Sequence, residues 1–402
     1  MARGPEIAVF ATHIAPALGY GGVSVMAAAL TKAWAVHARR IRLCACNASL
    51  GSALRPGDVQ LGSNVEVRLY RAYWFRRWGF GFGAIPKIFT LCLRSPVAYI
   101  HGIATFPSTL AALACSALRR PFVVAPRGGL MPEHVAFIRR HKPHKWCYYK
   151  LLTLPTLKRA AAIHCTSDTE AAGVTALLGE TAPVHVIPNG VDCKGFTAQP
   201  GPPLGRLVSC YLGHIQREKG INAFIRVWLR CRGPGDSLIV AGRGTDEAYF
   251  REFQHLVEVA EGAICYRGYV EHAAVRAILA ESHFLVLPSG LEQAGGMREN
   301  FGNVVAEALA AGRPALVTRG LAWDKLETVG AGFVFDRTPA SVAQTLARVA
   351  ALSPEAWQAL SLAARRYAER ELDGEALAER VWHVVSAKLS DPDPQTVGAH
   401  HA

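Results

Sequence analysis

Short apolar runs alternate with longer segments of helical periodicity along most of the chain. Turn-forming residues bound the runs, which is the pattern of buried parallel strands joined by crossover helices. In the first half the runs predict strands at 7–10, 41–46, 65–70, 98–101, 122–125, 162–165 and 185–188. The periodic segments between them predict helices at 24–38, 108–117 and 169–178. This half is therefore predicted to be a parallel α/β domain.

The alternation restarts after residues 199–205, the stretch densest in proline and glycine and the best linker candidate. Beyond it the pattern predicts strands at 207–212, 237–241, 264–266, 284–287 and 315–318, and helices at 221–229, 248–259, 273–279 and 304–311. Residues 339–390 are predicted to be helical.

A chain of 402 residues fits two domains better than one compact core. We expect two Rossmann-like α/β domains facing each other across a cleft, at 1–195 and 206–375. A C-terminal helix at 376–390 is expected to pack back on the first domain, and residues 391–402 are expected to be a disordered tail.

Positive charge is confined to the first half. Residues 1–190 hold 22 Lys and Arg against 7 Asp and Glu, whereas the rest of the chain holds 22 against 24. The asymmetry suggests that the first domain meets an anionic partner: nucleic acid, a phospholipid surface or a phosphorylated substrate. A generally basic proteome would produce the same excess.

The ten cysteines are dispersed through apolar segments without a CxxC pair, as buried residues of a reduced compartment are. Residues 1–5 lead straight into a strand, so no signal peptide is expected. No apolar stretch reaches the roughly 18 to 20 clean residues of a spanning helix. Metal binding is not supported, because Asp391-Pro392-Asp393 lies in the expected tail and His141 and His144 lack helical spacing and further ligands.

The segment 298–312 has the most specific chemistry. It follows a buried strand and delivers Gly302 and Asn303 to the start of an alanine-rich helix, whose unpaired N–H groups suit a diphosphate. Glu299 stands before this helix and Glu307 lies inside it, so their carboxylates can reach different hydroxyl pairs of one ligand. Glu307 is equally explained as a glutamate stabilised by the helix dipole.

The two glutamates, with seven residues between them in Glu-Asn-Phe-Gly and Glu-Ala-Leu-Ala-Ala-Gly, resemble the E-x7-E signature of family 4, the retaining glycosyltransferases of GT-B fold. Further segments similar to the family are 186–192, 211–214 with Lys219-Gly220, and Gly19-Tyr20-Gly21-Gly22. The likeness extends to about residue 385, and runs at 125–130 and 319–323 are most similar to the branch that builds exopolysaccharide or O-antigen repeats.

The resemblance implies a UDP- or GDP-sugar donor, bound mainly by the second domain, with neither a metal nor another cofactor. Glu299 would touch the donor sugar, Glu307 the ribose, and Lys219 the diphosphate. Backbone N–H groups of Phe301, Gly302, Asn303 and Val304 would face the donor. Gly21 and Gly22 would let the backbone approach the donor phosphates or the acceptor, unless they form a simple tight turn.

Two residues and one loop depart from the family pattern. His214 stands where arginine is usual, and Arg217 is a candidate replacement for that cation. Arg127 stands near the place of a histidine in many relatives; because arginine cannot act as a base, we expect it to bind phosphate or acceptor. The loop 290–298 is longer than usual and is expected to reshape the sugar pocket.

The acceptor is expected to be a saccharide, linked to polyprenyl diphosphate and held by the first domain. His101, at the end of a predicted strand, is a candidate acceptor contact or simply a hydrogen-bonded histidine. Segment 71–82 mixes arginines with large aromatics, as membrane-interface segments do, or is a loop packed on its own domain. No nucleic-acid module surrounds it. We therefore expect a cytoplasmic protein, peripheral to the inner face of the plasma membrane.

Two other classes remain open. One is a nucleotide-sugar epimerase or phosphorylase of the same architecture. The other is a non-catalytic sugar-nucleotide-binding subunit at the membrane, for which His214 is the best argument.

Overall fold

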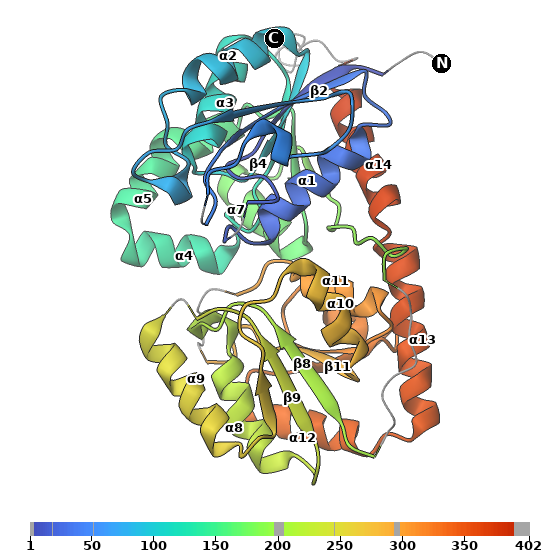
Figure 1. The fold of residues 1–402 in the computed structure, drawn as a ribbon. Helices are drawn as coiled ribbons and strands as arrows, with labels where there is room; N and C mark the ends of the chain where they lie inside the picture. The colour runs from blue at the N-terminus through green and yellow to red at the C-terminus, as the bar shows by residue number, and fades with distance from the viewer. Residues whose placement is uncertain are drawn as a thin grey trace. The chain divides into compact units, whose positions relative to one another are not determined.

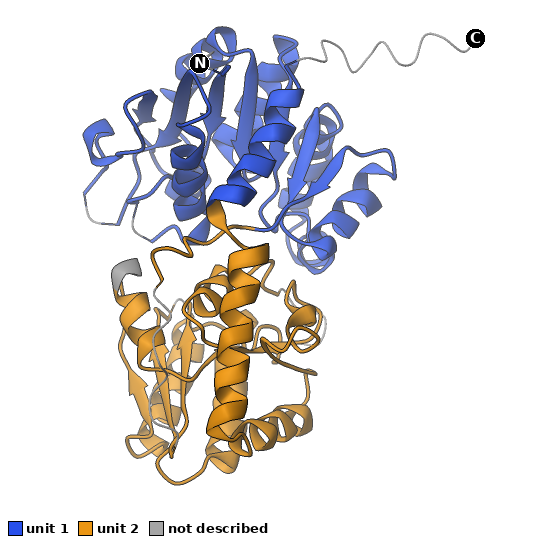
Figure 2. Ribbon diagram, turned by 90° about the vertical axis from the view of Figure 1, so that its right-hand side faces the viewer, with its two compact units in different colours: residues 1–188, 375–402 blue, residues 189–374 orange. Residues whose placement is uncertain are grey.

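The computed structural model describes residues 4–17, 19–50, 52–196, 205–244, 246–292 and 298–389. Chain contacts divide it into two compact units, residues 1–188 with 375–402 and residues 189–374, coloured separately in Figure 2. Most of the predicted linker 199–205, residues 293–297 of the long loop and the predicted tail 391–402 lie outside the described residues.

Unit 1 is built on a seven-stranded parallel sheet with the order β3-β2-β1-β4-β5-β6-β7. Its strands are β1 Glu6–Phe10, β2 Arg40–Cys46, β3 Val65–Tyr70, β4 Val97–His101, β5 Phe122–Ala125, β6 Ala162–Cys165 and β7 Val184–Val186. Its helices are α1 Gly22–Trp34, α2 Ala84–Arg94, α3 Phe106–Ala117, α4 Pro132–His141, α5 Pro143–Tyr148, α6 Leu154–Leu157, α7 Asp168–Leu178 and α14 Gly374–Ala387.

Both faces of this sheet are covered, as Figure 1 shows. Ala8 and Phe10 of β1 join the core formed with α2 and α3, whereas Ile7 and Val9 join the core formed with α1 and α14. This burial on both faces explains why the strands are continuous apolar runs and not alternating ones. α14 is tied to unit 1 by a hydrogen bond of 2.8 Å from Trp34 Nε1 to the Ala378 carbonyl.

Unit 2 repeats the arrangement with six parallel strands in the order β10-β9-β8-β11-β12-β13. Its strands are β8 Val208–Leu212, β9 Ser237–Ala241, β10 Ile264–Tyr266, β11 Phe284–Leu287, β12 Ala315–Thr318 and β13 Gly332–Phe335. Its helices are α8 Ile221–Cys231, α9 Glu247–Val259, α10 His272–Ala280, α11 Asn303–Ala310, α12 Pro339–Ala350 and α13 Pro354–Glu371. The predicted fold class, two parallel-sheet Rossmann-like domains, is confirmed.

The sequence pattern missed some elements and misplaced some ends. α2 was missed although its buried residues Ala84, Ile88, Leu91 and Cys92 recur at helical spacing. α4, α5 and β13 were also missed. α1 begins at Gly22 and ends at Trp34, whereas 24–38 was predicted. Among the described residues, no helix is both long and apolar enough to cross a membrane.

Candidate functional site

The sequence motifs of unit 2 lie at the point where the strand order of its sheet reverses. β8 and β11 are neighbours, and the strand that follows each of them in sequence lies on its outer side, β9 next to β8 and β12 next to β11. A crevice for ligands is expected outside the carboxyl ends of two such strands. The turn after β8, Arg217–Lys219, is fastened to the segment after β11. Gly290 N–H donates to the Glu218 carbonyl at 2.9 Å, and Ser289 Oγ donates to the same oxygen at 3.1 Å. Glu299 N–H in turn donates to Ser289 Oγ at 2.8 Å.

Glu299 and Lys219 form a direct ion pair in this place. Burial alone would raise the pKa of Glu299, but the charge and hydrogen bond of Lys219 lower it below its ordinary value. The Asn300 N–H and the nearby His214 act in the same direction. Glu299 is therefore an ionised carboxylate, which accepts hydrogen bonds and donates none. His214 is held by its own carbonyl, which accepts from Tyr211 Oη at 2.7 Å.

The N-terminus of α11 lies next to this ion pair and is uncapped by a side chain. Its N-cap, Gly302, has φ 77°, a conformation that favours glycine. A methyl group on Gly302 would come 2.9 Å from Leu287 Cδ2 and 3.2 Å from Glu299 Cγ, so a larger residue would also displace the carboxylate. Phe301 packs against Trp323, whose Nε1 donates to the Phe301 carbonyl.

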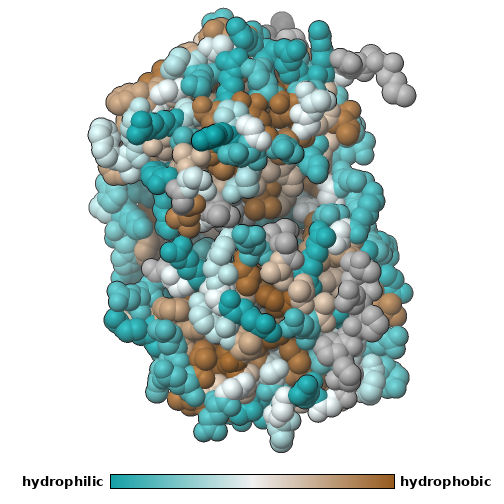
Figure 3. Space-filling model, viewed as in Figure 1, coloured by the Kyte–Doolittle hydropathy of each residue, from teal (hydrophilic) through white to brown (hydrophobic). Residues whose placement is uncertain are grey.

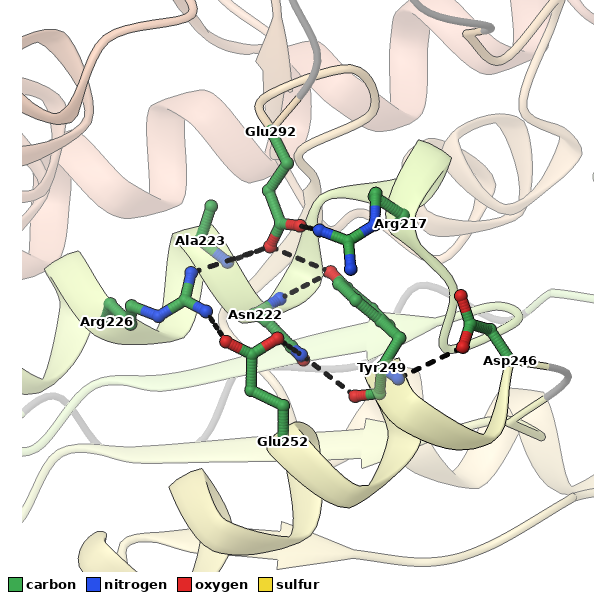
Figure 4. A network of polar contacts seen from close by, with 8 residues as sticks. All are labelled: Arg217, Asn222, Ala223, Arg226, Asp246, Tyr249, Glu252 and Glu292. Carbon is green, nitrogen blue, oxygen red and sulfur yellow. Dashed lines mark hydrogen bonds and ion pairs between the residues drawn. The ribbon is translucent and has the colours of Figure 1, made fainter.

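The N-terminus of α8 is at the same edge but is already occupied. Asn222 N–H donates to Tyr249 Oη at 3.0 Å, and Ala223 N–H donates to Glu292 Oε1 at 2.8 Å (Figure 4). Since a helix N-terminus binds an anion through such N–H groups, α11 offers the accessible anion site and α8 does not.

Glu307 lies inside α11 and differs in character from Glu299. Burial raises its pKa to about 7, and the charge of Arg276 only partly opposes this. The carboxyl group therefore changes its charge close to neutral pH.

The residues predicted for the acceptor lie in unit 1. Arg127 follows β5 with φ 54°, and its Nη2 donates to Tyr99 Oη at 3.3 Å and approaches His101 Nδ1 at 3.5 Å. His101 is buried, and this burial, together with the Arg127 charge, pushes its pKa well below the ordinary value. His101 is therefore neutral. Its contact with an acceptor stays a prediction.

Gly21 and Gly22 stand at the start of α1. Gly21 is the N-cap with φ 71°, and no side chain caps the helix. The structure thus brings together His214, Arg217, Lys219, Glu299 and the start of α11 in unit 2, and His101 with Arg127 in unit 1.

Three residues of these surroundings were missed. Glu292 and Tyr249 contact the turn after β8, and the buried Glu170 accepts from the N–H groups of Gly128 and Thr166 beside Arg127. Glu170 was detectable as an acid in the first turn of α7, but its partners are remote in sequence. Among the described residues, no group of three His, Cys, Asp or Glu side chains is arranged to hold a metal ion.

Comparison with known proteins agrees with this architecture. Residues 20–194 match the family model "Glycosyltransferase Family 4", and residues 206–351 match "Glycosyl transferases group 1". A 2-deoxystreptamine N-acetyl-D-glucosaminyltransferase from Streptomyces fradiae is 30% identical over 172 residues, which is 39% of this chain and 39% of that protein.

Solved structures show the same fold at low identity. Sucrose-phosphate synthase from Thermosynechococcus elongatus has a TM-score of 0.74 at 17% identity, over 96% of this chain and 99% of the other. HepE from Anabaena, in complex with UDP and glucose, has a TM-score of 0.72 at 16% identity, over 95% of this chain and 100% of the other. The chain thus carries a glycosyltransferase family 4 domain followed by a glycosyl transferases group 1 domain, on a GT-B frame of two Rossmann-like units.

Proposed function

We propose that this protein is a retaining hexosyltransferase. It takes a hexose from a UDP- or GDP-sugar and adds it to a saccharide acceptor linked to polyprenyl diphosphate, in exopolysaccharide or O-antigen biosynthesis. The observation that carries the proposal is the Lys219–Glu299 ion pair beside the uncapped N-terminus of α11, at the point where the strand order of the sheet of unit 2 reverses.

These residues suit the departure of a nucleoside diphosphate. Negative charge gathers on the diphosphate as the bond to the sugar breaks, and fixed donors stabilise it without having to reorganise. The Lys219 ammonium and the backbone N–H groups of 301–304 supply such donors. Glu299, being ionised, orients sugar hydroxyls, and Glu307 binds the ribose. The acceptor attacks the sugar on the same face that the phosphate leaves, and that phosphate assists the attack. The configuration of the anomeric carbon is therefore retained.

Similar proteins support a nucleotide-sugar donor. HepE was solved with UDP, with UDP and glucose, and with UDP-glucose, and a trehalose-6-phosphate protein of E. coli was solved with UDP-2-fluoro glucose. WaaG, with a TM-score of 0.68, is described as a glycosyltransferase of lipopolysaccharide biosynthesis.

A panel of nucleotide sugars, scored by thermal stabilisation and then by transfer, tests the proposal. The wild type should be stabilised by a UDP- or GDP-sugar, while Glu307→Gln and Lys219→Ala should bind the donor more weakly and transfer the sugar more slowly. Binding and transfer unchanged in both variants would overturn the donor site. Epimerised sugar formed without acceptor would instead indicate an epimerase, and binding without any transfer would indicate a non-catalytic subunit.

The acceptor proposal places unit 1 against the cytoplasmic face of an anionic membrane. Apolar side chains lie at the surface among hydrophilic ones on the face drawn in Figure 3. Segment 71–82 and α2 expose large apolar side chains close to arginines: Tyr73, Trp74, Phe75, Phe82, Ile85, Phe89 and Leu93. Aromatic and basic residues together favour a membrane interface. Trp78, by contrast, donates to the Ala104 carbonyl at 3.0 Å and packs in its own unit.

The membrane proposal is tested by replacing Trp74, Phe75, Phe89 and Leu93 with serine. Sedimentation with vesicles that contain phosphatidylglycerol should fall to the background level. The matched control replaces Val259 and Leu362, which are 55% exposed in unit 2, and should leave binding intact. Equal binding by all variants would contradict the proposal.

A further inference from the structure

Arg217 has a side chain that is oriented by two neighbours and is half exposed. Its guanidinium lies over the ring of Tyr249, 5.3 Å from the centroid, and its Nη1 lies 3.6 Å from Glu292 Oε2. The structure contains no hydrogen bond from this guanidinium to another described residue, and 48% of the side chain is exposed. The ring and the carboxylate thus set its direction but leave its N–H groups for a ligand.

Glu292 is itself immobilised, as Figure 4 shows. Its side chain is only 8% exposed. Its Oε1 accepts from Ala223 N–H at 2.8 Å and from Tyr249 Oη at 3.0 Å, and lies 3.7 Å from Arg226 Nη1. A buried carboxylate held by this many partners is a fixed reference point for a neighbouring cation.

Tyr249, which donates a hydrogen bond to Glu292, is itself held in place by its neighbours. Tyr249 is fully buried, and its hydroxyl also accepts from Asn222 N–H. Asn222 Nδ2 donates to the Tyr249 carbonyl and to Glu252, and Glu252 pairs with Arg226. Arg217 and Arg226 balance Glu252 and Glu292 in charge, and Asp246, which accepts from the Tyr249 N–H at 3.1 Å, adds one negative charge to the cluster.

Arg217 belongs to the same three-residue turn as Lys219, which pairs with Glu299. The resemblance to family 4 implies an arginine at position 214, where this chain has a histidine, and arginine is the side chain whose charge and planar fork suit a phosphate. Arg217 is two residues from Lys219 on this turn and is therefore a candidate for such a group.

We propose that Glu292 is a positioning residue: through its charge and through Tyr249 it holds Arg217 ready for the diphosphate of the donor. The inference rests on the proposed function, because it needs a nucleoside diphosphate at this edge of unit 2. On this proposal the function of the long loop after β11 is to contribute Glu292, a described residue that holds a donor-binding cation in position.

The test compares Glu292→Gln with Arg217→Met and with both changes together, using titration calorimetry with UDP and GDP. Glutamine can still accept from Ala223 N–H and Tyr249 Oη, but it turns an uncharged amide toward Arg217. We expect the dissociation constant to rise about tenfold in each single variant, as for one weakened charge-assisted contact, and no further in the double variant.

Glu247→Gln is the control. Glu247 lies on the same helix as Tyr249, its side chain is 87% exposed, and it pairs with Arg251 and not with a residue of this cluster. It should leave the dissociation constant unchanged. Equal effects of the two glutamine variants on binding, or additive effects of Glu292→Gln and Arg217→Met, would overturn the inference. A wild type that binds no nucleotide or nucleotide sugar would instead overturn the proposed function.

Discussion

Glu299 and Glu307 belong to one motif, yet the structure shifts their pKa values in opposite directions. The charge of Lys219 lowers the pKa of Glu299, whereas burial inside the helix raises that of Glu307 to about 7. Glu299 is therefore ionised throughout the physiological range, and Glu307 is a mixture of two forms. The motif alone predicts two carboxylates, and the surroundings of each decide its charge.

The titration of Glu307 predicts pH-dependent donor binding. Its ionised form can accept hydrogen bonds from both ribose hydroxyls, so UDP-sugar affinity should rise by about tenfold between pH 6 and pH 8, across its pKa of about 7. Binding near pH 7 should also release protons, which calorimetry in buffers of different ionisation enthalpy detects. Glu307→Gln should abolish both effects. An unchanged pH slope in that variant would assign the dependence to another group.

The same titration affects stability. The folded pKa of Glu307 lies above the ordinary value of 4.5, so its contribution to the free energy of unfolding is complete below pH 4.5 and is lost as the pH rises to about 7.

At the scale of elements, the structure separates three helices that start in the same way. α1, α8 and α11 each have a glycine N-cap with positive φ and no side-chain cap of their own. Tyr249 and Glu292 then occupy the N-terminus of α8 from elsewhere in the chain. The local sequence therefore marks three possible anion sites, and tertiary contacts close one of them.

α7 provides a prediction at this scale. Glu170, in its first turn, is fully buried and accepts from the N–H groups of Gly128 and Thr166, the latter at 2.9 Å. Glu170→Gln would turn an N–H₂ group toward one of these donors and should lower the free energy of unfolding by about 1–3 kcal/mol. Urea denaturation measures this loss.

The control for Glu170 is the exposed Glu180 of the same unit. Glu180→Gln should change the free energy of unfolding by less than about 0.5 kcal/mol. A Glu170→Gln protein as stable as wild type would show that the carboxylate is not needed to hold Gly128 and the neighbouring Arg127 in place.

At the scale of the whole molecule, the chain returns to its first unit at the end. α14 packs on α1 with a set of buried side chains: Leu377, Ala378, Val381, Trp382 and Val385. Trp382 lies 5.9 Å from Trp34 between ring centroids and stacks near His37. The C-terminal helix is therefore part of the core of unit 1, not an appendage.

Trp382→Ala should consequently destabilise unit 1 by about 3–5 kcal/mol, the range for deleting a large buried aromatic side chain. Denaturation monitored by proteolysis, with fragments assigned to each unit by mass spectrometry, should show unit 1 opening at lower urea while unit 2 is unaffected. Leu362→Ala, at an exposed position of α13, serves as the control. Simultaneous loss of both units would mean that they unfold as one.

Much of the fold followed from the sequence because parallel strands buried on both faces must be continuous apolar runs. Such runs as 7–10 and 284–287 are visible without any partner. α2 and α4 were not predicted: α2 was overlooked although its buried residues recur at helical spacing, and α4 buries only Val135 and Ile138, which gives a weak apolar pattern. Element ends were also imprecise: at α1, only the packing of Trp34 and the glycines before it define where the helix runs.

The sequence by itself determined the chemical character of the candidate site: two glutamates, a lysine and glycines with a spacing that suits a strand, a turn and a helix. Only the tertiary structure decided that Lys219 pairs with Glu299, that Glu307 titrates near pH 7, and that Glu292 orients Arg217. The physical reason is that spacing along the chain is set by local backbone geometry, whereas burial, charge and hydrogen bonding depend on which distant segments the sheet brings together.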